Sequence, residues 1–292
     1  MSAPSFFIIG APKCGTTSLA GWLGTHPAIY MPALKEPAYF AADLTQRRPN
    51  RRAYQALFAA ADERHVAIGE ASTCYLYSQV AVPAILDQRP TSRFIVCLRN
   101  PIEMAQSLHQ QVLFDLNEDI GTFEDAWRLQ DARREGRRVP RMCREPWVLA
   151  YEARCRLGEQ VARLLRHVDR EKALFVLLDD LQADPAREYR RVLAFLDLTD
   201  DGRAAFPVLN RAKHARSRVV KRGVEFLSEL RCALGVTGRL GIRPVLDRLN
   251  TRPVTPAPLT NDMKNSLRTC FASDVGLLGS SIGRDLSHWM AS

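Results

Sequence analysis

The sequence has no long hydrophobic run. Its apolar stretches fall well short of the roughly 20 residues that a membrane-spanning helix needs. The N-terminal segment also lacks the basic region and the long apolar core of a secretory signal peptide. We therefore expect no stable insertion into a membrane. The composition, 46% hydrophobic and 25% charged residues, is that of an ordinary soluble globular protein.

Paired cysteines are lacking as well. The chain has seven cysteines, an odd number, and they are scattered without the spacing of disulfides or metal sites. This pattern predicts reduced thiols and a cytoplasmic protein.

Acidic residues are fewer than basic ones. The chain has 41 lysines and arginines against 32 aspartates and glutamates, which gives a net charge of +9. This excess indicates an anionic partner, which could be nucleic acid, a membrane surface, an acidic glycan or a nucleotide. Basic residues cluster at 47–52, 133–141 and 211–222. We expect the first two clusters to be solvated surface.

Residues 6–18 are the stretch around which the chain is organised. Four apolar residues predict a short buried strand that ends at Gly10, and the apolar spacing farther on predicts a helix from about Thr16. The first N–H groups of a helix are unpaired, and its dipole adds partial positive charge there. Together with the charge of Lys13 and three neighbouring hydroxyl groups, they predict a phosphate site.

The spacing of this loop separates two kinds of phosphate chemistry. A nucleotide triphosphatase has the pattern G-x-x-x-x-G-K-[ST], whose lysine reaches the β and γ phosphates. Here Thr16 stands at the position of that lysine, and the loop's lysine is Lys13. A later predicted strand does end in Asp179-Asp180, which we interpret as a helix-capping turn rather than a magnesium site. A βα turn that binds no ligand is the alternative for the whole loop.

The run Pro-Lys-x-Gly-Thr-Thr-Ser at 12–18, placed after an apolar strand, resembles the 5′-phosphosulfate loop of sulfotransferases that use 3′-phosphoadenosine 5′-phosphosulfate (PAPS). The resemblance implies that this loop binds PAPS and its product 3′-phosphoadenosine 5′-phosphate (PAP), with Lys13 also acting in catalysis. The nucleotide-binding residues that it implies here are Lys13, Cys14, Gly15, Thr16, Thr17 and Ser18. We also expect no metal cofactor, because these donors would already hold the phosphate leaving group.

Two further segments resemble elements of the same family. Glu36, in Lys-Glu-Pro-Ala-Tyr-Phe, is similar to the glutamate that acts as catalytic base in the carbohydrate sulfotransferases. Glu70-Ala-Ser-Thr-Cys-Tyr resembles their Glu-Lys-Ser-Pro-x-Tyr element, but Ala71 replaces the lysine and Thr73 replaces the proline. This departure leaves more of the charge stabilisation to Lys13 and weakens the case for a heparan-type acceptor. Glu70 is the alternative base.

Two further strands are predicted, at 66–69 and at 93–98, and the latter ends at Arg99-Asn-Pro, where a helix should begin. Because ligands collect beyond the carboxyl ends of strands in open α/β sheets, Arg99 should face the same ligand as the first loop. Arginine followed by serine eight residues later resembles the family's 3′-phosphate site, with Arg99 and Ser107 as its residues. An arginine that pairs with a nearby acid is the alternative.

The third basic cluster contains Lys-Arg-Gly at 221–223, which loosely resembles the Arg-Lys-Gly triplet of the cytosolic sulfotransferases. Those enzymes close a basic loop over the nucleotide. The resemblance therefore implies that Arg216, Lys221 and Arg222 contribute to nucleotide binding.

The resemblance covers nearly the whole chain. It implies a single sulfotransferase domain over 1–292, with a helical C-terminal extension at about 253–292. The expected fold is α/β, a P-loop-like three-layer arrangement with a central parallel sheet and helices on both faces. The expected partners are the nucleotide donor and an acceptor hydroxyl or amine on a carbohydrate, lipid or small metabolite, without nucleic acid. A nucleotide kinase and a basic nucleic-acid-binding protein are the alternatives.

Overall fold

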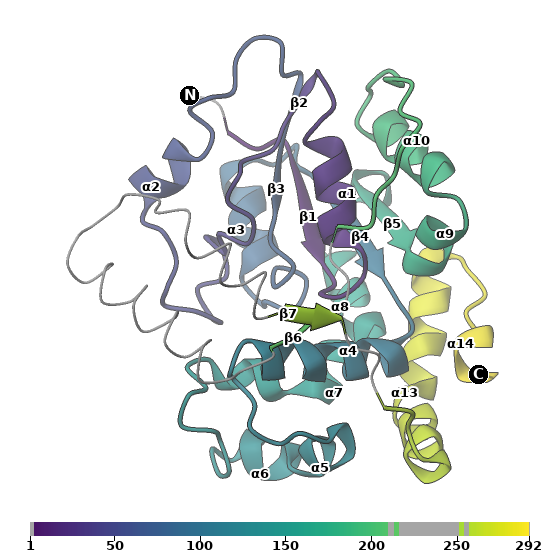
Figure 1. Cartoon of the computed structure of the whole chain (residues 1–292). Coiled ribbons are helices and arrows are strands. Elements are labelled where there is room, and N and C mark those ends of the chain that lie inside the picture. Colours follow the sequence, from purple (N-terminus) through teal and green to yellow (C-terminus); the bar gives the residue numbers. More distant parts are fainter. Residues whose placement is uncertain (1–2, 210–212, 216–250, 254–256, 292) are drawn as a thin grey trace. The chain divides into compact units, whose positions relative to one another are not determined.

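The computed structural model describes residues 3–209, 213–215, 251–253 and 257–291 (Figure 1). These residues divide into two compact units. The first takes in the described parts of Met1–Met104, Glu152–Asn210 and Asn261–Ser292, and the second those of Ala105–Tyr151 and Arg211–Thr260. The single domain expected over the whole chain stays a prediction, and each unit is described by itself.

A five-stranded parallel sheet forms the centre of the first unit. Its spatial order is β2-β3-β1-β4-β5, and every neighbouring pair is parallel. Strands buried on both faces read as continuous apolar runs, as β1 and β4 do. The strands are β1 (Phe6–Gly10), β2 (Ile29–Tyr30), β3 (Ala67–Ala71), β4 (Arg93–Leu98) and β5 (Ala173–Leu177).

Helices cover both faces of this sheet. The chain runs from β1 through α1 to the edge strand β2 in one direction and from β3 through α3 to β4 in the other, so right-handed crossovers put α1 and α3 on opposite faces. Figure 1 shows α1 in front of the strands and α3 and α8 behind them. This confirms the predicted three-layer α/β fold. The helices of this unit include α1 (Thr16–Leu23), α2 (Arg51–Ala56), α3 (Ala81–Gln88), α8 (Leu157–Leu164), α9 (Leu178–Ala183), α10 (Pro185–Phe195), α13 (Asn261–Ile282) and α14 (His288–Ala291).

The C-terminal helices are bound to the rest of this unit by polar contacts that are buried or partly buried. The Asp274 carboxylate on α13 accepts the N–H groups of Gly158 and Glu159 at 2.8 and 2.9 Å, at the start of α8. The Trp289 indole donates to Asp179 at 2.6 Å, and its carbonyl accepts the Asn100 side chain at 3.0 Å. Trp289 therefore joins the carboxyl ends of β4 and β5.

The predicted helix-capping role of Asp179-Asp180 is wrong. Both residues lie in the first turn of α9, but no side chain caps that helix. Asp179 binds Trp289 instead, and Asp180 accepts the Arg284 guanidinium at 2.9 Å. These partners lie more than 100 residues farther along the chain, so local sequence could not reveal them. None of the helices in the described ranges is long and apolar enough to cross a membrane.

The helix α4 (Pro101–Phe114) begins in the first unit, and its part from Ala105 onward belongs to the second unit. The second unit also contains a buried ion pair. Its other elements are α5 (Phe123–Arg128), α6 (Gln130–Arg134), a 3-10 turn at Pro146–Leu149, and the antiparallel pair of β6 (Lys213–Ala215) and β7 (Thr251–Pro253). The guanidinium of Arg133 donates to both oxygens of Glu118 at 2.6 and 2.7 Å, and both side chains are almost fully buried. The expectation of a solvated surface is therefore wrong for Arg133.

We expect the substitution Arg133→Met to lower the free energy of unfolding by about 3–5 kcal/mol, because it leaves the Glu118 carboxylate buried without its cation. Chemical denaturation measures this change. The matched control is Arg134→Met, which removes an exposed ion pair with Asp131 and should change stability by less than about 1 kcal/mol. Equal effects of the two substitutions would contradict the structural role of the buried pair.

Candidate active site

The phosphate loop connects β1 to α1 at the centre of the sheet. Lys13 and Gly15 have φ angles of 67° and 85°. Position 15 requires glycine for two reasons. Its positive φ is unfavourable for other residues, and a Cβ there would lie 2.8 Å from the Leu181 side chain. The first backbone bond of α1 runs from the Leu19 N–H to the Gly15 carbonyl at 3.1 Å. The N–H groups of residues 16–18 precede that bond, so the helix offers them no backbone acceptor.

The side chains of this loop differ in how far a ligand can reach them. Lys13 and Thr17 are half-buried, and Thr16 is buried. The Cys14 thiol is fully buried near the Met104 sulfur at 3.9 Å, and burial raises its pKa well above the ordinary value. It is therefore no reactive thiolate, and only the main chain of Cys14 suits a phosphate. The Ser18 hydroxyl accepts the Leu209 N–H at 3.1 Å.

Arg99 meets the phosphate loop directly. It follows β4, and its Nη1 donates to the Lys13 carbonyl at 3.3 Å. Its Nε and Nη2 donate to the Glu103 carboxylate at 3.0 and 2.8 Å. Arg99 thus pairs with a nearby acid, as the alternative interpretation of this residue expected. It also contacts the phosphate loop, so the acid pair alone does not account for its position. The two elements predicted to bind one nucleotide lie at the point where the strand order reverses, between β1 and β4.

The structure does not describe all predicted nucleotide contacts. Ser107 is half-buried on α4 and belongs to the second unit, so it is placed only within that unit. Arg216, Lys221 and Arg222 lie outside the described residues. Their roles stay predictions.

Glu36 lies on a turn that is bound to the end of β3. Its N–H donates to the Ala71 carbonyl at 2.9 Å. One carboxylate oxygen accepts the Thr73 N–H at 2.7 Å, and the Thr73 hydroxyl lies 3.2 Å from both oxygens. The Glu36 side chain is still 39% exposed. The carboxylate is thus held in one place and can be reached from solvent.

Lys35 was not among the site residues predicted from the sequence. Its ammonium group lies 2.6 Å from a Glu36 oxygen. Burial raises the pKa of the Cys97 thiol to about 12, and the positive charge of Lys35 opposes that rise. In the sequence, its position directly before Glu36 in Lys-Glu-Pro could have revealed it. Lys35 supplies positive charge next to Glu36, whereas Ala71 stands where the Glu-Lys-Ser-Pro-x-Tyr element has its lysine.

Glu70 has different surroundings from Glu36. Its side chain is fully buried. One oxygen accepts the Ser72 hydroxyl at 2.6 Å, and the other accepts those of Tyr54 and Tyr75 at 2.7 and 3.0 Å. Burial raises the pKa of the Glu70 carboxyl to about 7, against the effect of these three donors.

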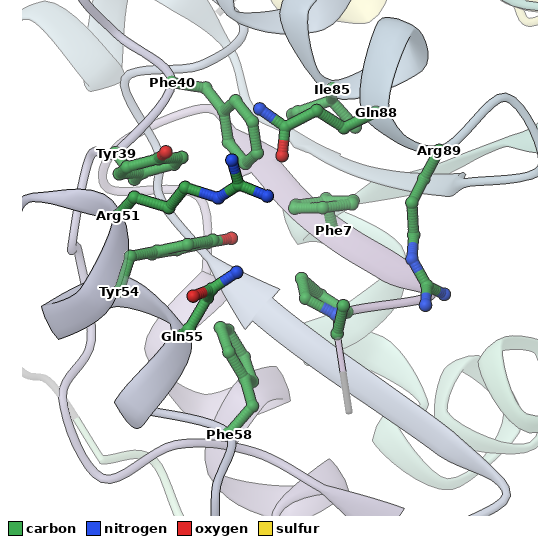
Figure 2. Close-up of a pocket in the computed structure, with 12 residues that line it drawn as sticks. Phe7, Tyr39, Phe40, Arg51, Tyr54, Gln55, Phe58, Ile85, Gln88 and Arg89 are labelled. Atoms are coloured by element: carbon green, nitrogen blue, oxygen red, sulfur yellow. The ribbon is translucent and has the colours of Figure 1, made fainter. Parts of the chain in front are cut away.

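A pocket with aromatic walls includes Phe7 of β1 (Figure 2), which pairs in register with Glu70 of β3. Residues that precede β1, Ala3 and Pro4, line it, so it lies at the opposite end of that strand from the phosphate loop. Its volume of about 80 Å³ is well below the several hundred Å³ of sites that enclose a nucleotide-sized ligand. The rings that line it are those of Phe7, Tyr39, Phe40, Tyr54 and Phe58.

The comparisons with known proteins give one consistent result. A family model described as "Sulfotransferase domain" matches residues 3–216. The crystal structure of a sulfotransferase from Alicyclobacillus acidocaldarius is similar over 99% of both chains, with a TM-score of 0.73 and 26% sequence identity.

Curated relatives match over a shorter stretch. Carbohydrate sulfotransferase 15 of Mus musculus is 30% identical over 36% of this chain and 26% of its own length. Membrane-associated sulfotransferase kil1 of Dictyostelium discoideum is 30% identical over 36% of this chain and 22% of its own length. The matched stretch is thus about a quarter of these relatives.

Proposed function

Because the chain belongs to the sulfotransferase domain family, we propose that it transfers a sulfuryl group from PAPS to a hydroxyl or amine of an acceptor. The observation that carries this proposal is the bond from Arg99 to the Lys13 carbonyl, which joins the two elements expected to bind the two ends of one nucleotide. Glu36 is anchored to the chain segment that follows β3, the strand next to β1.

The residues of the first unit fit this donor. The N–H groups at the start of α1, the hydroxyl of Thr17 and the charge of Lys13 suit the phosphosulfate end. The planar guanidinium of Arg99 suits the 3′-phosphate, because it can donate two parallel hydrogen bonds to one phosphate group. Bound PAPS supplies a sulfuryl group joined to a phosphate leaving group, and the S–O bond to that phosphate breaks as the bond from sulfur to the acceptor forms.

Each side chain has a distinct role in this proposal. Glu36 takes the proton of the acceptor hydroxyl or amine, since its carboxylate is fixed and open to solvent. Lys13 and the loop N–H groups stabilise the negative charge that develops on the leaving phosphate. Lys35 adds a second positive charge and orients Glu36. Glu70 is a poor candidate for the base because no part of its side chain is exposed.

Family membership argues against the two alternative functions. A nucleotide kinase of this fold would need a lysine at position 16, where the chain has threonine. A nucleic-acid-binding protein would account for the net charge but not for the bond between Arg99 and the phosphate loop.

Mass spectrometry tests the proposed function. Cell extract incubated with the protein and labelled PAPS should contain a product heavier by one sulfuryl group, and extract incubated for the same time with the Lys13→Ala variant should contain far less of that product. ATP with magnesium binding more tightly than PAPS would favour a kinase and contradict the proposal. A steep salt-dependent association with duplex DNA, without sulfuryl transfer, would favour a nucleic-acid-binding protein.

Arg99 should distinguish PAPS from adenosine 5′-phosphosulfate, which lacks the 3′-phosphate. A hydrogen bond to a charged group contributes about 1.5–3 kcal/mol, and each 1.4 kcal/mol is about tenfold in affinity. We therefore expect Arg99→Ala to weaken PAPS binding by roughly ten- to a hundredfold and to change binding of the dephosphorylated nucleotide little. Calorimetry with both nucleotides and both proteins gives the coupling energy.

The matched control is Arg64→Ala, which removes an exposed arginine that is also paired with a carboxylate, Asp62. Both affinities should stay unchanged in that variant. A coupling energy near zero for Arg99→Ala would mean that another group binds the 3′-phosphate.

A further inference from the structure

The turn that carries Glu36 has an unfavourable backbone conformation. Glu36 and Ala38 have φ angles of 59° and 51°, a left-handed region that is energetically unfavourable for residues other than glycine. Surrounding contacts must therefore hold the turn in this shape. Besides the bonds of Glu36 itself, the N–H of Ala38 donates to the Ser72 hydroxyl oxygen at 3.0 Å, and that of Phe40 donates to the Tyr75 hydroxyl oxygen at 3.3 Å.

Glu70 determines how these two hydroxyl groups point. A hydroxyl has one proton to donate and lone pairs with which to accept. Ser72 and Tyr75 each donate their proton to the Glu70 carboxylate, at 2.6 and 3.0 Å. Their lone pairs are thereby left to accept the N–H groups of the turn. Without a carboxylate behind them, the two protons would have no such acceptor.

The position of Glu70 excludes two simpler readings. A base must reach the acceptor's proton, and the Glu70 side chain has no exposed surface. A residue that only fills the core would be apolar, because burying a carboxyl is unfavourable unless its hydrogen bonds compensate. Glu70 instead receives three hydroxyl donors, and two of those hydroxyls bind the turn that carries Glu36.

We infer that Glu70 is a positioning residue, which orients the Ser72 and Tyr75 hydroxyls so that they hold the turn of residues 36–40 and thereby fix the Glu36 carboxylate. This inference rests on the proposed function as far as Glu36 is the base. The hydrogen-bond relay from Glu70 to the turn does not depend on that role.

Amide hydrogen exchange, followed by NMR on the whole chain, tests the relay. Ser72→Ala should accelerate exchange at Ala38, and Tyr75→Phe should accelerate it at Phe40, each by about tenfold, the effect of one ordinary hydrogen bond. Glu70→Gln should accelerate both, because a glutamine has one acceptor oxygen and cannot face both hydroxyls with it. The matched control is Tyr39→Phe, a hydroxyl deletion in the same turn that leaves the donors to Glu70 in place and should change neither amide.

Kinetics then separates positioning from catalysis. In Glu70→Gln, kcat should fall about tenfold with little change in the KM for PAPS, a smaller loss than Glu36→Gln causes. Unchanged exchange at both amides, or faster exchange spread evenly over the sheet, would overturn the inference. Should Glu70→Gln fail to fold, Ser72→Ala and Tyr75→Phe still give the position-specific pattern. A wild-type protein that does not bind PAP would contradict the proposed function, while the amide results would still decide the relay.

Discussion

Glu36→Gln should stop most of the sulfuryl transfer while PAPS still binds. The amide keeps the shape of the side chain and can still accept the Thr73 N–H, now at 2.7 Å from the carboxylate, so the turn should stay in place. What it loses is the ability to take the acceptor's proton. Removal of a general base typically costs about a hundred- to ten-thousandfold in rate. Steady-state kinetics with the acceptor found by mass spectrometry, together with calorimetry of PAP, measures both quantities.

The control for this experiment is Glu63→Gln, the same chemical change at an exposed residue, which should be fully active. The result also decides between the two candidate bases. An active Glu36→Gln variant together with an inactive Glu70→Gln variant would assign the base to Glu70 and would contradict its role as a positioning residue.

Lys13→Ala should reduce turnover by on the order of a hundredfold and weaken nucleotide binding much less. The loss of one group that stabilises charge in a transition state has about this effect on kcat. The substitution is informative because Arg99 binds the carbonyl of Lys13 and not its side chain, so the contact between loop and arginine should survive. Rapid-mixing kinetics and PAP calorimetry separate the two effects.

Lys172→Ala serves as the control, since it removes a lysine whose partner is the nearby Asp169. Lys35→Ala gives a second comparison, because Lys35 is bound to Glu36 and should affect turnover through both charge and orientation. Near-normal turnover of Lys13→Ala would leave Lys13 without a catalytic role. A larger loss in Lys35→Ala would transfer that role to Lys35.

The elements of the sheet that carry the site could be predicted because their sequences are locally consistent. The apolar runs at 6–9 and 94–98 are continuous, as buried parallel strands require, and both end at polar loops. The strand before Glu70 was predicted at 66–69, but β3 is Ala67–Ala71. The prediction ended one residue before Glu70 because a charged residue is not expected inside a buried strand. Tyr54, on a separate helix, supplies one of the donors that make this burial possible.

Residues that depend on distant partners could not be predicted. Arg133 looked like part of an exposed basic run, yet it pairs with Glu118 inside the second unit. Lys35 was not predicted as a site residue, and its contact with Glu36 became visible only in the structure. For both residues the sequence shows the charge, and only the three-dimensional structure shows which carboxylate that charge contacts.

The two bonds of Trp289 have a thermodynamic consequence for nucleotide binding. They tie together the ends of β4 and β5, and Arg99 directly precedes the Asn100 that makes one of them. Glu103 and the Lys13 carbonyl hold the Arg99 guanidinium itself. An arginine side chain that is free in solution loses up to about 2 kcal/mol of rotamer entropy when it is immobilised. Here folding has already removed much of that freedom, so a phosphate that binds Arg99 encounters a rigid receptor and the entropic penalty of association is smaller.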